Sequence, residues 1–319
     1  MTRTETLAAE PGREIQQSTD AVLMIRPHRF HPNPETAADN AFQKAIDAGE
    51  LDGVSLAAQR EFDLAVKTLR DAGVTVHVVN DTATPEKPDA VFPNNWFSTH
   101  HDGRVPLYPM YSAARRPERR HDVIEELRKH YQITGVVDYS ASEGEGRCLE
   151  GTGSLVLDHV NKLAYASLSH RTHPEVLEKF CADFGYEPVK FCSTSEDGRP
   201  VYHTNVMMCI ASEFALVAFD LIPDEAERAA VRKRLERTGK MVIDLAPRQI
   251  TQFAGNAIEL HNATEKLLVL SARAAAALDA EQRAQIERFA RLLPLTLPTI
   301  ELAGGSARCM IATIHLPSR

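Results

Sequence analysis

The sequence contains no Cys-x-x-Cys pair, and its five cysteines are an odd number. This spacing argues against a disulfide framework and against a cysteine-rich zinc site, and it is typical of a protein in the reducing cytoplasm. A single cysteine is more often a small buried hydrophobic residue than a reactive group. A role for any one of them therefore needs a separate argument. The five are Cys148, Cys181, Cys192, Cys209 and Cys309.

Long apolar runs and an excess of positive charge are also missing. No apolar segment approaches the ~18 to 20 residues of a membrane-spanning helix. Residues 1–20 lack the apolar core of a secretory signal, and we expect a flexible arm there. The formal net charge is -8, and the basic clusters at 115–120 and 232–237 are offset by glutamates. The sequence therefore predicts neither a membrane nor a nucleic-acid partner.

An internal repeat is the most informative feature that the sequence does have. At 43% hydrophobic and 25% charged residues the chain can build a core. Four units each show a polar opening segment, a strand, a tight turn, a second strand and an amphipathic helix. The opening segments begin at Phe92, Glu150, His203 and Gly255. Small polar residues recur at separations of 51, 51 and 50 residues, namely Ser154, Asn205, Asn256 and Ser306.

A fifth unit is split between the two ends of the chain. Residues 304–314 supply a final strand, and residues 21–27, 57–73 and 74–79 supply a strand, a helix and another strand. Units whose first and last copies share strands would close into a ring, which removes exposed sheet edges. We therefore expect an α/β fold of five ββαβ units in a single domain, 21–319. An open α/β sheet with coincidental spacing is the alternative.

In such a ring the polar opening segments converge near the axis. They contain Asn94, Asn95, Glu150, His203, Asn205, Asn256 and Cys309. A carboxylate, an imidazole and a thiol at matching positions of different repeats are the parts of a nucleophilic cysteine–histidine site. Gly304 and Gly305 let the backbone approach a ligand closely, and Arg308 favours a thiolate. The alternatives are a core cysteine at a strand start and a hydrogen-bonded core histidine.

The remaining histidines and the glycine-rich runs do not indicate a catalytic or cofactor-binding site. We expect His100, His101, His170 and His173, which lie in turns or loops, to face solvent. The glycines at 144–146 and 151–153 precede a strand and a hairpin, so they are not a dinucleotide-binding fingerprint. No metal-ligand spacing is present. We therefore expect neither a metal nor an organic cofactor.

Five motifs together resemble the amidinotransferase (pentein) superfamily, which includes arginine deiminase, dimethylarginine dimethylaminohydrolase and glycine amidinotransferase. They are DAVFPNN at 89–95, LEG at 149–151, SHRT at 169–172, HTN at 203–205 and GGSARC at 304–309. The likeness runs from about residue 21 to residue 317. It implies a five-bladed, pseudo-fivefold α/β propeller of ββαβ repeats.

The resemblance also implies roles for individual residues. Cys309, His203 and Glu150 match the catalytic set, and Arg171 matches an arginine that grips the α-carboxylate of the substrate. A second carboxylate-binding arginine is expected at Arg115 or Arg116, with Arg116 preferred. Asn95, Asn205, Asn94 and Asp89 fall at substrate-binding positions.

Two departures from the family pattern bear on the substrate. Arginine deiminases carry aspartates where this chain has Asn95 and Asn205. Burying a cationic guanidinium with too few counter-charges costs several kcal/mol, whereas a carboxamide suits a neutral ureido group that presents both a C=O and N–H donors. The sequence thus favours a citrulline-like substrate and resembles the citrulline-hydrolysing members. The alternative is that both asparagines simply cap turns.

The predicted reaction is hydrolysis of citrulline to ornithine, ammonia and carbon dioxide. Cys309 attacks the ureido carbon, His203 transfers protons and Glu150 orients the substrate N–H groups. The order in which ammonia and ornithine leave stays open, and a homo-oligomer is compatible with the sequence.

Other functions remain as alternatives. A guanidino hydrolase, or an amidinotransferase, acting on arginine or a methylated arginine is the nearest, and a non-catalytic propeller scaffold is the second. A papain-like protease is weaker because its cysteine precedes its histidine.

Overall fold

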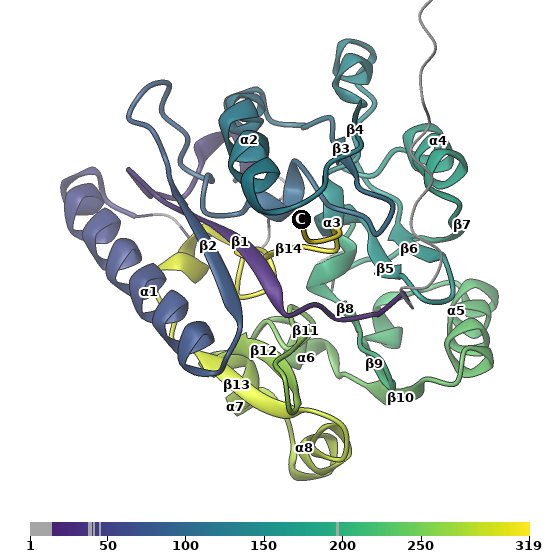
Figure 1. Ribbon diagram of the computed structural model, residues 1–319. Helices are drawn as coiled ribbons and strands as arrows, with labels where there is room; N and C mark the ends of the chain where they lie inside the picture. The colour runs from purple at the N-terminus through teal and green to yellow at the C-terminus, as the bar shows by residue number, and fades with distance from the viewer. Residues whose placement is uncertain (1–14, 38–39, 41, 45, 196–197) are drawn as a thin grey trace, which may run out of the picture.

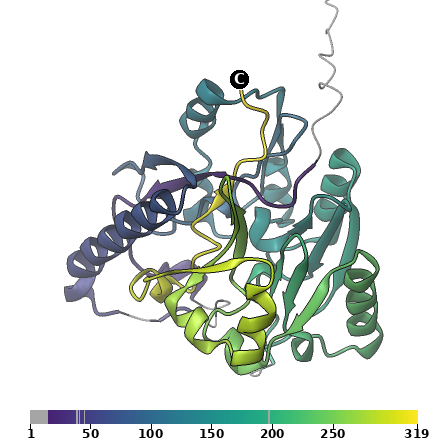
Figure 2. The same ribbon diagram turned by 60° about the horizontal axis from the view of Figure 1, so that its bottom comes forward.

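Five separate sheets make up the interior of the molecule (Figure 1). This computed structural model describes residues 15–37, 40, 42–44, 46–195 and 198–319. Within these residues four sheets have three strands and one has two. The helices lie on the outside of the sheets, as both views show (Figures 1 and 2).

The third unit of the chain shows the repeating pattern most clearly. Its β5 (Val156–Asp158) pairs antiparallel with β6 (Leu163–Ser167), and β6 pairs parallel with β7 (Glu187–Phe191). The crossover is α4 (Pro174–Phe184), which begins with proline in its first turn and ends at a left-handed Gly185. This is the ββαβ order expected from the repeat.

The next two units follow the same order. One contains β8 (Met208–Ile210), β9 (Phe214–Val217), α5 (Glu225–Arg237) and β10 (Met241–Asp244). The other contains β11 (Ile258–His261), β12 (Lys266–Ser271), α7 (Ala272–Ala277), α8 (Ala280–Glu287) and β13 (Arg291–Leu295). Here the single helix expected from the sequence is two helices, because Asp279 caps a new one by accepting a hydrogen bond from Gln282 N at 2.8 Å.

The two ends of the described chain meet in one sheet. Its order is β14 (Ala312–Thr313), β1 (Ala21–Arg26) and β2 (Thr75–Asn80), with Val22 opposite Thr313 in the antiparallel pair. The crossover from β1 to β2 is α1 (Leu51–Asp71). The expectation that one unit is split between the termini is therefore confirmed by strand pairing.

The remaining unit is less regular than the sequence suggests. It contains β3 (Arg104–Leu107), α2 (His121–His130) and β4 (Gly135–Asp138), and its expected first strand is reduced to a bridge between Phe97 and Leu107. Ser98 N donates to Pro106 O at 3.4 Å. Proline has no N–H to return that bond, so the antiparallel ladder is interrupted.

A ring of continuously paired strands does not form. No strand pairing joins one sheet to the next in the part of the chain that the structure describes, so each sheet keeps its own edges. Buried side chains make the contacts between sheets instead: one apolar cluster combines Val156 and Tyr165 with Phe214 and Leu268. The sheets are thus held together by packing.

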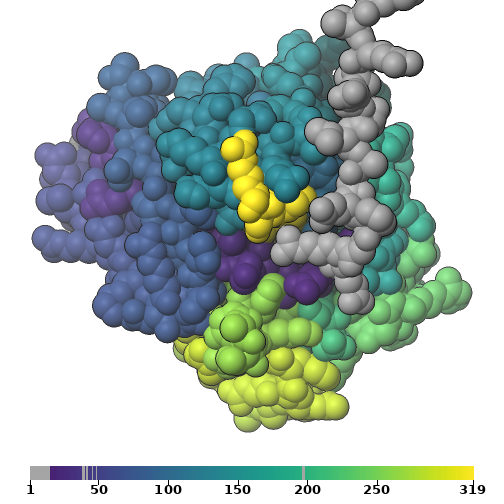
Figure 3. Space-filling model, in the orientation of Figure 1, coloured from purple at the N-terminus to yellow at the C-terminus, as the bar shows by residue number. Residues whose placement is uncertain are grey.

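The described part of the N-terminal segment is packed against the body. Gln17 Nε2 donates to Leu157 O at 2.9 Å and to Ile210 O at 3.2 Å, and Thr19 Oγ1 donates to Ile314 O at 2.6 Å. The C-terminal residues (yellow) lie beside β1 residues (purple) on one face (Figure 3). Residues 1–14 of the arm predicted at 1–20 lie outside the described residues. From Gln17 onward the chain is hydrogen-bonded to the rest of the fold, so this part is not a flexible arm.

None of the described helices has both the length and the apolar character needed to cross a membrane.

Replacing Leu23 in β1 by alanine tests how far the split sheet supports the fold. Leu23 is fully buried, so we expect Leu23→Ala to lower the free energy of unfolding by about 2–5 kcal/mol. The control is Leu64→Ala on the exposed side of α1, where the side chain is 51% exposed and the change stays within about 0.5 kcal/mol. Urea denaturation followed by circular dichroism measures the free energy of unfolding of both variants. Equal losses would contradict the conclusion that the split sheet supports the fold.

Candidate active site

The opening segments of the repeats form short helical turns that touch one another. They are Pro93–Asn95, α3 (Gly151–Ser154) and Thr204–Val206, and α3 contacts both of the others. A Cβ atom on Gly151 would lie 2.3 Å from Asn94 O, and one on Gly153 would lie 2.4 Å from Asn95 Nδ2. Only glycine allows this approach. The convergence expected from the repeat is therefore present in the structure.

Glu150 and His203 form a buried hydrogen-bonded pair at this convergence. Their Oε2 and Nε2 atoms lie 2.8 Å apart, and Tyr111 N donates to Glu150 Oε1 at 2.9 Å. Burial lowers the pKa of His203, against the hydrogen bond and charge of Glu150, which raise it. The imidazole is therefore mainly neutral at pH 7 and able to accept a proton.

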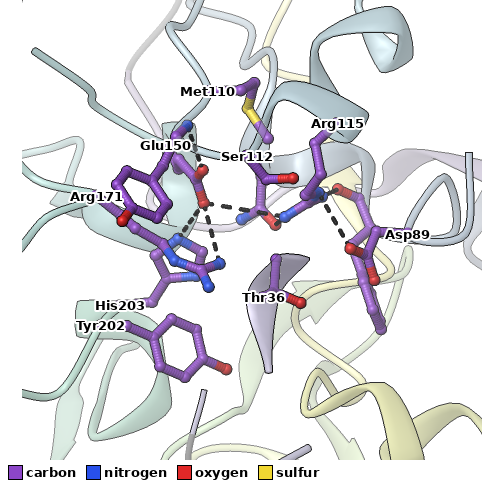
Figure 4. Close-up of polar contacts among 12 residues, drawn as sticks. Thr36, Asp89, Met110, Ser112, Arg115, Glu150, Arg171, Tyr202 and His203 are labelled. Carbon is purple, nitrogen blue, oxygen red and sulfur yellow. Dashed lines mark hydrogen bonds and ion pairs between the residues drawn. The ribbon is translucent and has the colours of Figure 1, made fainter. Parts of the chain in front are cut away.

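Two guanidinium groups surround the same carboxylate (Figure 4). Arg171 Nη1 lies 3.5 Å and Arg115 Nη1 lies 3.9 Å from Glu150 Oε2. Burial alone raises the pKa of Glu150, but Arg171, the His203 hydrogen bond and Arg115 together hold it below its ordinary value. Glu150 is thus an anion whose charge is already balanced by protein groups.

Arg115 is fixed by several acceptors. Its Nε and Nη2 donate to the two oxygens of Glu118 at 2.9 Å each, and its Nη1 donates to Asn95 Oδ1 at 3.0 Å. Asp89 Oδ2 lies 3.6 Å from its Nε. Burial raises the pKa of Glu118 to about 7, against the attraction of Arg115. The cluster around Arg115 is therefore close to electrically neutral.

The sulfur of Cys309 faces two carboxamides. Asn256 Nδ2 donates to Sγ at 3.2 Å and Asn205 Nδ2 at 3.5 Å, and the cysteine is only 4% exposed. Donors of this kind stabilise a thiolate. Gly304 and Gly305 make room for protein side chains: a Cβ on Gly304 would lie 2.4 Å from Asn40 Nδ2, and one on Gly305 would lie 2.7 Å from the Phe92 ring. Gly305 also lines the cavity described below, and a close approach of this backbone to a ligand stays a prediction.

Cys309 and His203 line the same small cavity. Its wall combines a thiol, an imidazole, two guanidinium groups and several polar side chains. The lining residues are Thr36, Asn40, Asp89, Phe92, Asn95, Arg115, Arg171, Tyr202, His203, Ala303, Gly305 and Cys309.

A family model described as "N,N dimethylarginine dimethylhydrolase, eukaryotic" matches residues 26–316. The chain belongs to this dimethylarginine dimethylhydrolase family. It is thereby a member of the amidinotransferase (pentein) superfamily. A search of curated proteins found no match.

Solved structures with the same fold include several that process arginine. The N-terminal domain of ArgZ, a cyanobacterial arginine dihydrolase bound to substrate, superimposes with a TM-score of 0.71 at 16% identity, covering 93% of this chain and 99% of that one. AgrE in a complex with ornithine and NAD⁺ gives 0.71 at 17% identity, covering 94% of this chain but 40% of that one. A dimethylarginine dimethylaminohydrolase adduct with S-methyl-L-thiocitrulline gives 0.63 at 16% identity, covering 92% and 98%.

The structure brings most of the residues predicted from the sequence together in or beside this one cavity. Cys309, His203, Arg171, Asn95 and Asp89 line the cavity. Glu150 and Asn205 do not line the cavity themselves. Each is hydrogen-bonded to a residue that does: Glu150 to His203 and Asn205 to Cys309. The side chain of Asn94 is buried, and neither of its polar atoms has a hydrogen-bond partner among the described residues.

Arg116 is the exception among the predicted residues. Its Nε lies 3.3 Å from both Met110 O and Glu143 Oε2, its side chain is 40% exposed, and it does not line the cavity. Arg115, the other arginine considered, occupies the site instead. The two neighbours point different ways because they lie in a short 3₁₀ helix (Ala113–Glu118), in which successive side chains diverge.

Two participants were not singled out from the sequence, and a third, Asn256, was expected at the convergence but was given no role. Its hydrogen bond to the sulfur of Cys309 supplies that role. Tyr202 lies under Arg171, with the guanidinium 4.7 Å from the ring centre. No sequence pattern indicated Glu118, because its ion pair with Arg115 depends on the burial of both side chains.

Replacing Glu150 by glutamine tests the electrostatic coupling of the site. Because Glu150 raises the pKa of His203, we expect Glu150→Gln to move protonation of His203 to lower pH, as followed by NMR of the imidazole protons. The variant also loses about 3–5 kcal/mol of stability, since two buried guanidinium groups lose a counter-ion. Glu118→Gln is the control: it removes a buried arginine partner with no contact to His203. An unchanged His203 titration in Glu150→Gln would contradict the coupling.

Proposed function

We propose that the chain is a cysteine-dependent hydrolase that acts on the ureido carbon of a free amino acid, with citrulline as the substrate. The observation that carries the proposal is the chemistry around the sulfur. Cys309 is approached by two neutral carboxamides, and the nearby anion Glu150 is already balanced by Arg171 and Arg115. Family membership supports hydrolysis of a C–N bond in an arginine derivative.

The charge balance supports a neutral substrate. Asp89 and Glu150 offset the guanidinium groups of Arg115 and Arg171. Glu118 also lies beside Arg115, and burial raises its pKa to about 7, so that it is only partly ionised at neutral pH. A cationic guanidinium would add one positive charge to this buried site, with less than one full negative charge left to balance it. A ureido group adds none, and it can donate to Asn205 Oδ1, which has no partner within the described chain.

The chemical steps follow from the nucleophile and the base. His203 takes the proton of the Cys309 thiol, and the resulting thiolate attacks the ureido carbon. His203 then passes that proton to the nitrogen that leaves. Water, deprotonated by His203, then attacks the S-linked carbonyl and regenerates the thiol. The carbamate released breaks down without further catalysis, so that citrulline and one water give ornithine, ammonia and carbon dioxide. Glu150 keeps the imidazole oriented throughout, through its 2.8 Å hydrogen bond.

We infer that Arg171 binds the substrate α-carboxylate. Arg115 already makes a bidentate contact with Glu118 and a hydrogen bond to Asn95, so it is committed to the protein. Arg171 lies on the cavity wall beside His203, so a carboxylate bound in the cavity can reach its guanidinium.

The finer architecture and the setting are part of the same proposal. Four units of ββαβ order, one of them split between the termini, and a fifth whose first strand is reduced to a bridge support a five-bladed pentein propeller. All five cysteines are free, which supports a reducing, cytoplasmic setting.

Hydrolysis of arginine or a methylated arginine is the second candidate. It is favoured by the family description and by relatives whose names specify arginine or dimethylarginine. Asp89 on the cavity wall and Glu150 next to it would balance the charge of a cationic substrate if Arg115 and Arg171 moved away. The two candidates differ in the charge that the site must accept.

Ammonia release from citrulline and from arginine separates the two candidates. We expect turnover of citrulline, with formation of ornithine, and at least about 10³-fold lower kcat in Cys309→Ser because the nucleophile is lost. Cys181→Ser is the matched control, since Cys181 is also buried but lies in the core of another unit. Turnover of arginine alone would overturn the ureido assignment, and full activity of Cys309→Ser would overturn the mechanism.

Introducing a charge beside the sulfur tests the role of the carboxamides. We expect Asn205→Asp to lower kcat/KM for citrulline at least about tenfold, because the new anion disfavours the thiolate and unbalances the neutral site. Any arginine turnover should rise relative to citrulline turnover. Asn262→Asp, in a turn of the β11–β12 hairpin away from the cavity, controls for the added charge. A citrulline kcat/KM equal in wild type and Asn205→Asp would refute the argument.

A further inference from the structure

Three histidines from different sheets meet away from the cysteine cavity. His101 lies in the turn before β3, His159 in the turn between β5 and β6, and His315 just after β14. One nitrogen of each lies within 4.8 Å of the other two. Because these residues are separated by long stretches of sequence, no motif spacing revealed the cluster.

The cluster is buried and its side chains face one another. His159 and His315 are 7% and 6% exposed, and their ring centres lie 4.1 Å apart. The ring of His101 lies 4.9 Å from that of His315. Nδ1 of His315 has no hydrogen-bond partner within the described chain. A buried nitrogen without a partner is costly, and a bound ion would satisfy it.

One ring is already oriented by an outer partner. Nδ1 of His159 lies 2.8 Å from the hydroxyl of Tyr186, which leaves Nε2 directed elsewhere. Metal-binding histidines typically use their second nitrogen in this way, and such outer contacts fix the ring and its tautomer. Burial, together with the charge of neighbouring histidines, keeps the pKa of His159 and of His315 well below the ordinary value. Both are therefore neutral, as a ligand must be.

We propose that His101, His159 and His315 bind one divalent transition-metal ion, with Zn²⁺ as the best match. Three imidazoles are a ligand set that suits zinc and its first-row neighbours. A tetrahedral site with ligands at about 2.0–2.1 Å places its nitrogens roughly 3.3 Å apart. The observed nitrogens all lie within 4.8 Å of one another, so ion binding would draw them together by at most about 1.5 Å.

This site is distinct from the cysteine cavity. His159 and His315 line a second cavity that shares no lining residue with the first. Arg308 adds positive charge to its wall, and Glu259, whose Oε1 has no partner in the part of the chain described, supplies negative charge. His101 is only partly buried, which gives an ion a route from solvent.

The metal ion would act as a cross-link. The three ligands belong to the β3–β4 sheet, the β5–β7 sheet and the sheet that contains β14. No strand pairing joins these sheets among the described residues. An ion held by all three therefore stabilises the relative positions of the sheets and holds the C-terminal segment in place. Its role is structural and does not depend on the function proposed above.

The test is metal binding to the full-length protein after removal of metals by a chelator. We expect one equivalent of Zn²⁺ by calorimetry, a rise in Tm on adding Zn²⁺, and visible absorption typical of tetrahedral Co²⁺ with Co²⁺ as a probe. His315→Gln and His101→Gln should each weaken binding at least about tenfold. Tyr186→Phe should weaken it less. His28→Gln, at an exposed histidine, should bind as wild type does.

The cysteine is the main competing ligand, so each titration is repeated with Cys309→Ser. Retention of one equivalent in Cys309→Ser supports the histidine site, and its loss there would overturn the proposal. No binding to wild type, or binding that survives His101→Gln and His315→Gln together, would also overturn it. Circular dichroism of the metal-free variants shows whether they fold; if His315→Gln does not, the partly exposed His101→Gln decides the outcome.

Discussion

The buried carboxylate of Glu150 organises the centre of the molecule. It accepts hydrogen bonds from His203 and from Tyr111 N, and it lies beside the guanidinium groups of Arg171 and Arg115. An anion placed in such a site without these partners would be expensive to bury. The partners come from different units of the repeat, so the charge of Glu150 is stabilised only when those units are assembled. The same requirement places the imidazole where the chemistry needs it.

Tight backbone contacts around this carboxylate make the arrangement rigid. The turn that follows Glu150 approaches its neighbour so closely that Gly151 and Gly153 cannot carry a side chain without collision. Asn95 and His203 lie on the other side of that contact. Catalytic geometry held by such turns tolerates little displacement. The cavity wall and the hydrogen-bonded pair of Glu150 and His203 are thus built from the same short segments of chain.

Much of this could be predicted from the sequence because it is periodic. Equal spacing of small polar residues located the units, and the matching positions of Glu150, His203 and Cys309 indicated that they meet. Periodicity says less about what lies between the repeats. Arg115 and Arg116 are adjacent, and only the folded turn shows which of them reaches the cavity. His100, which we expected to face solvent, is 3% exposed because aromatic side chains from α4 cover it.

From the sequence one could predict the superfamily, the order of most strands and helices, and candidates for the nucleophile, base and carboxylate. Each of these rests on local spacing, side-chain type or a short motif. Three features became visible only in the folded molecule. The sheets stay separate, Glu118 forms a bidentate ion pair with Arg115, and three distant histidines converge. Those features arise from packing between units, which brings together residues whose separation along the chain carries no periodic signal.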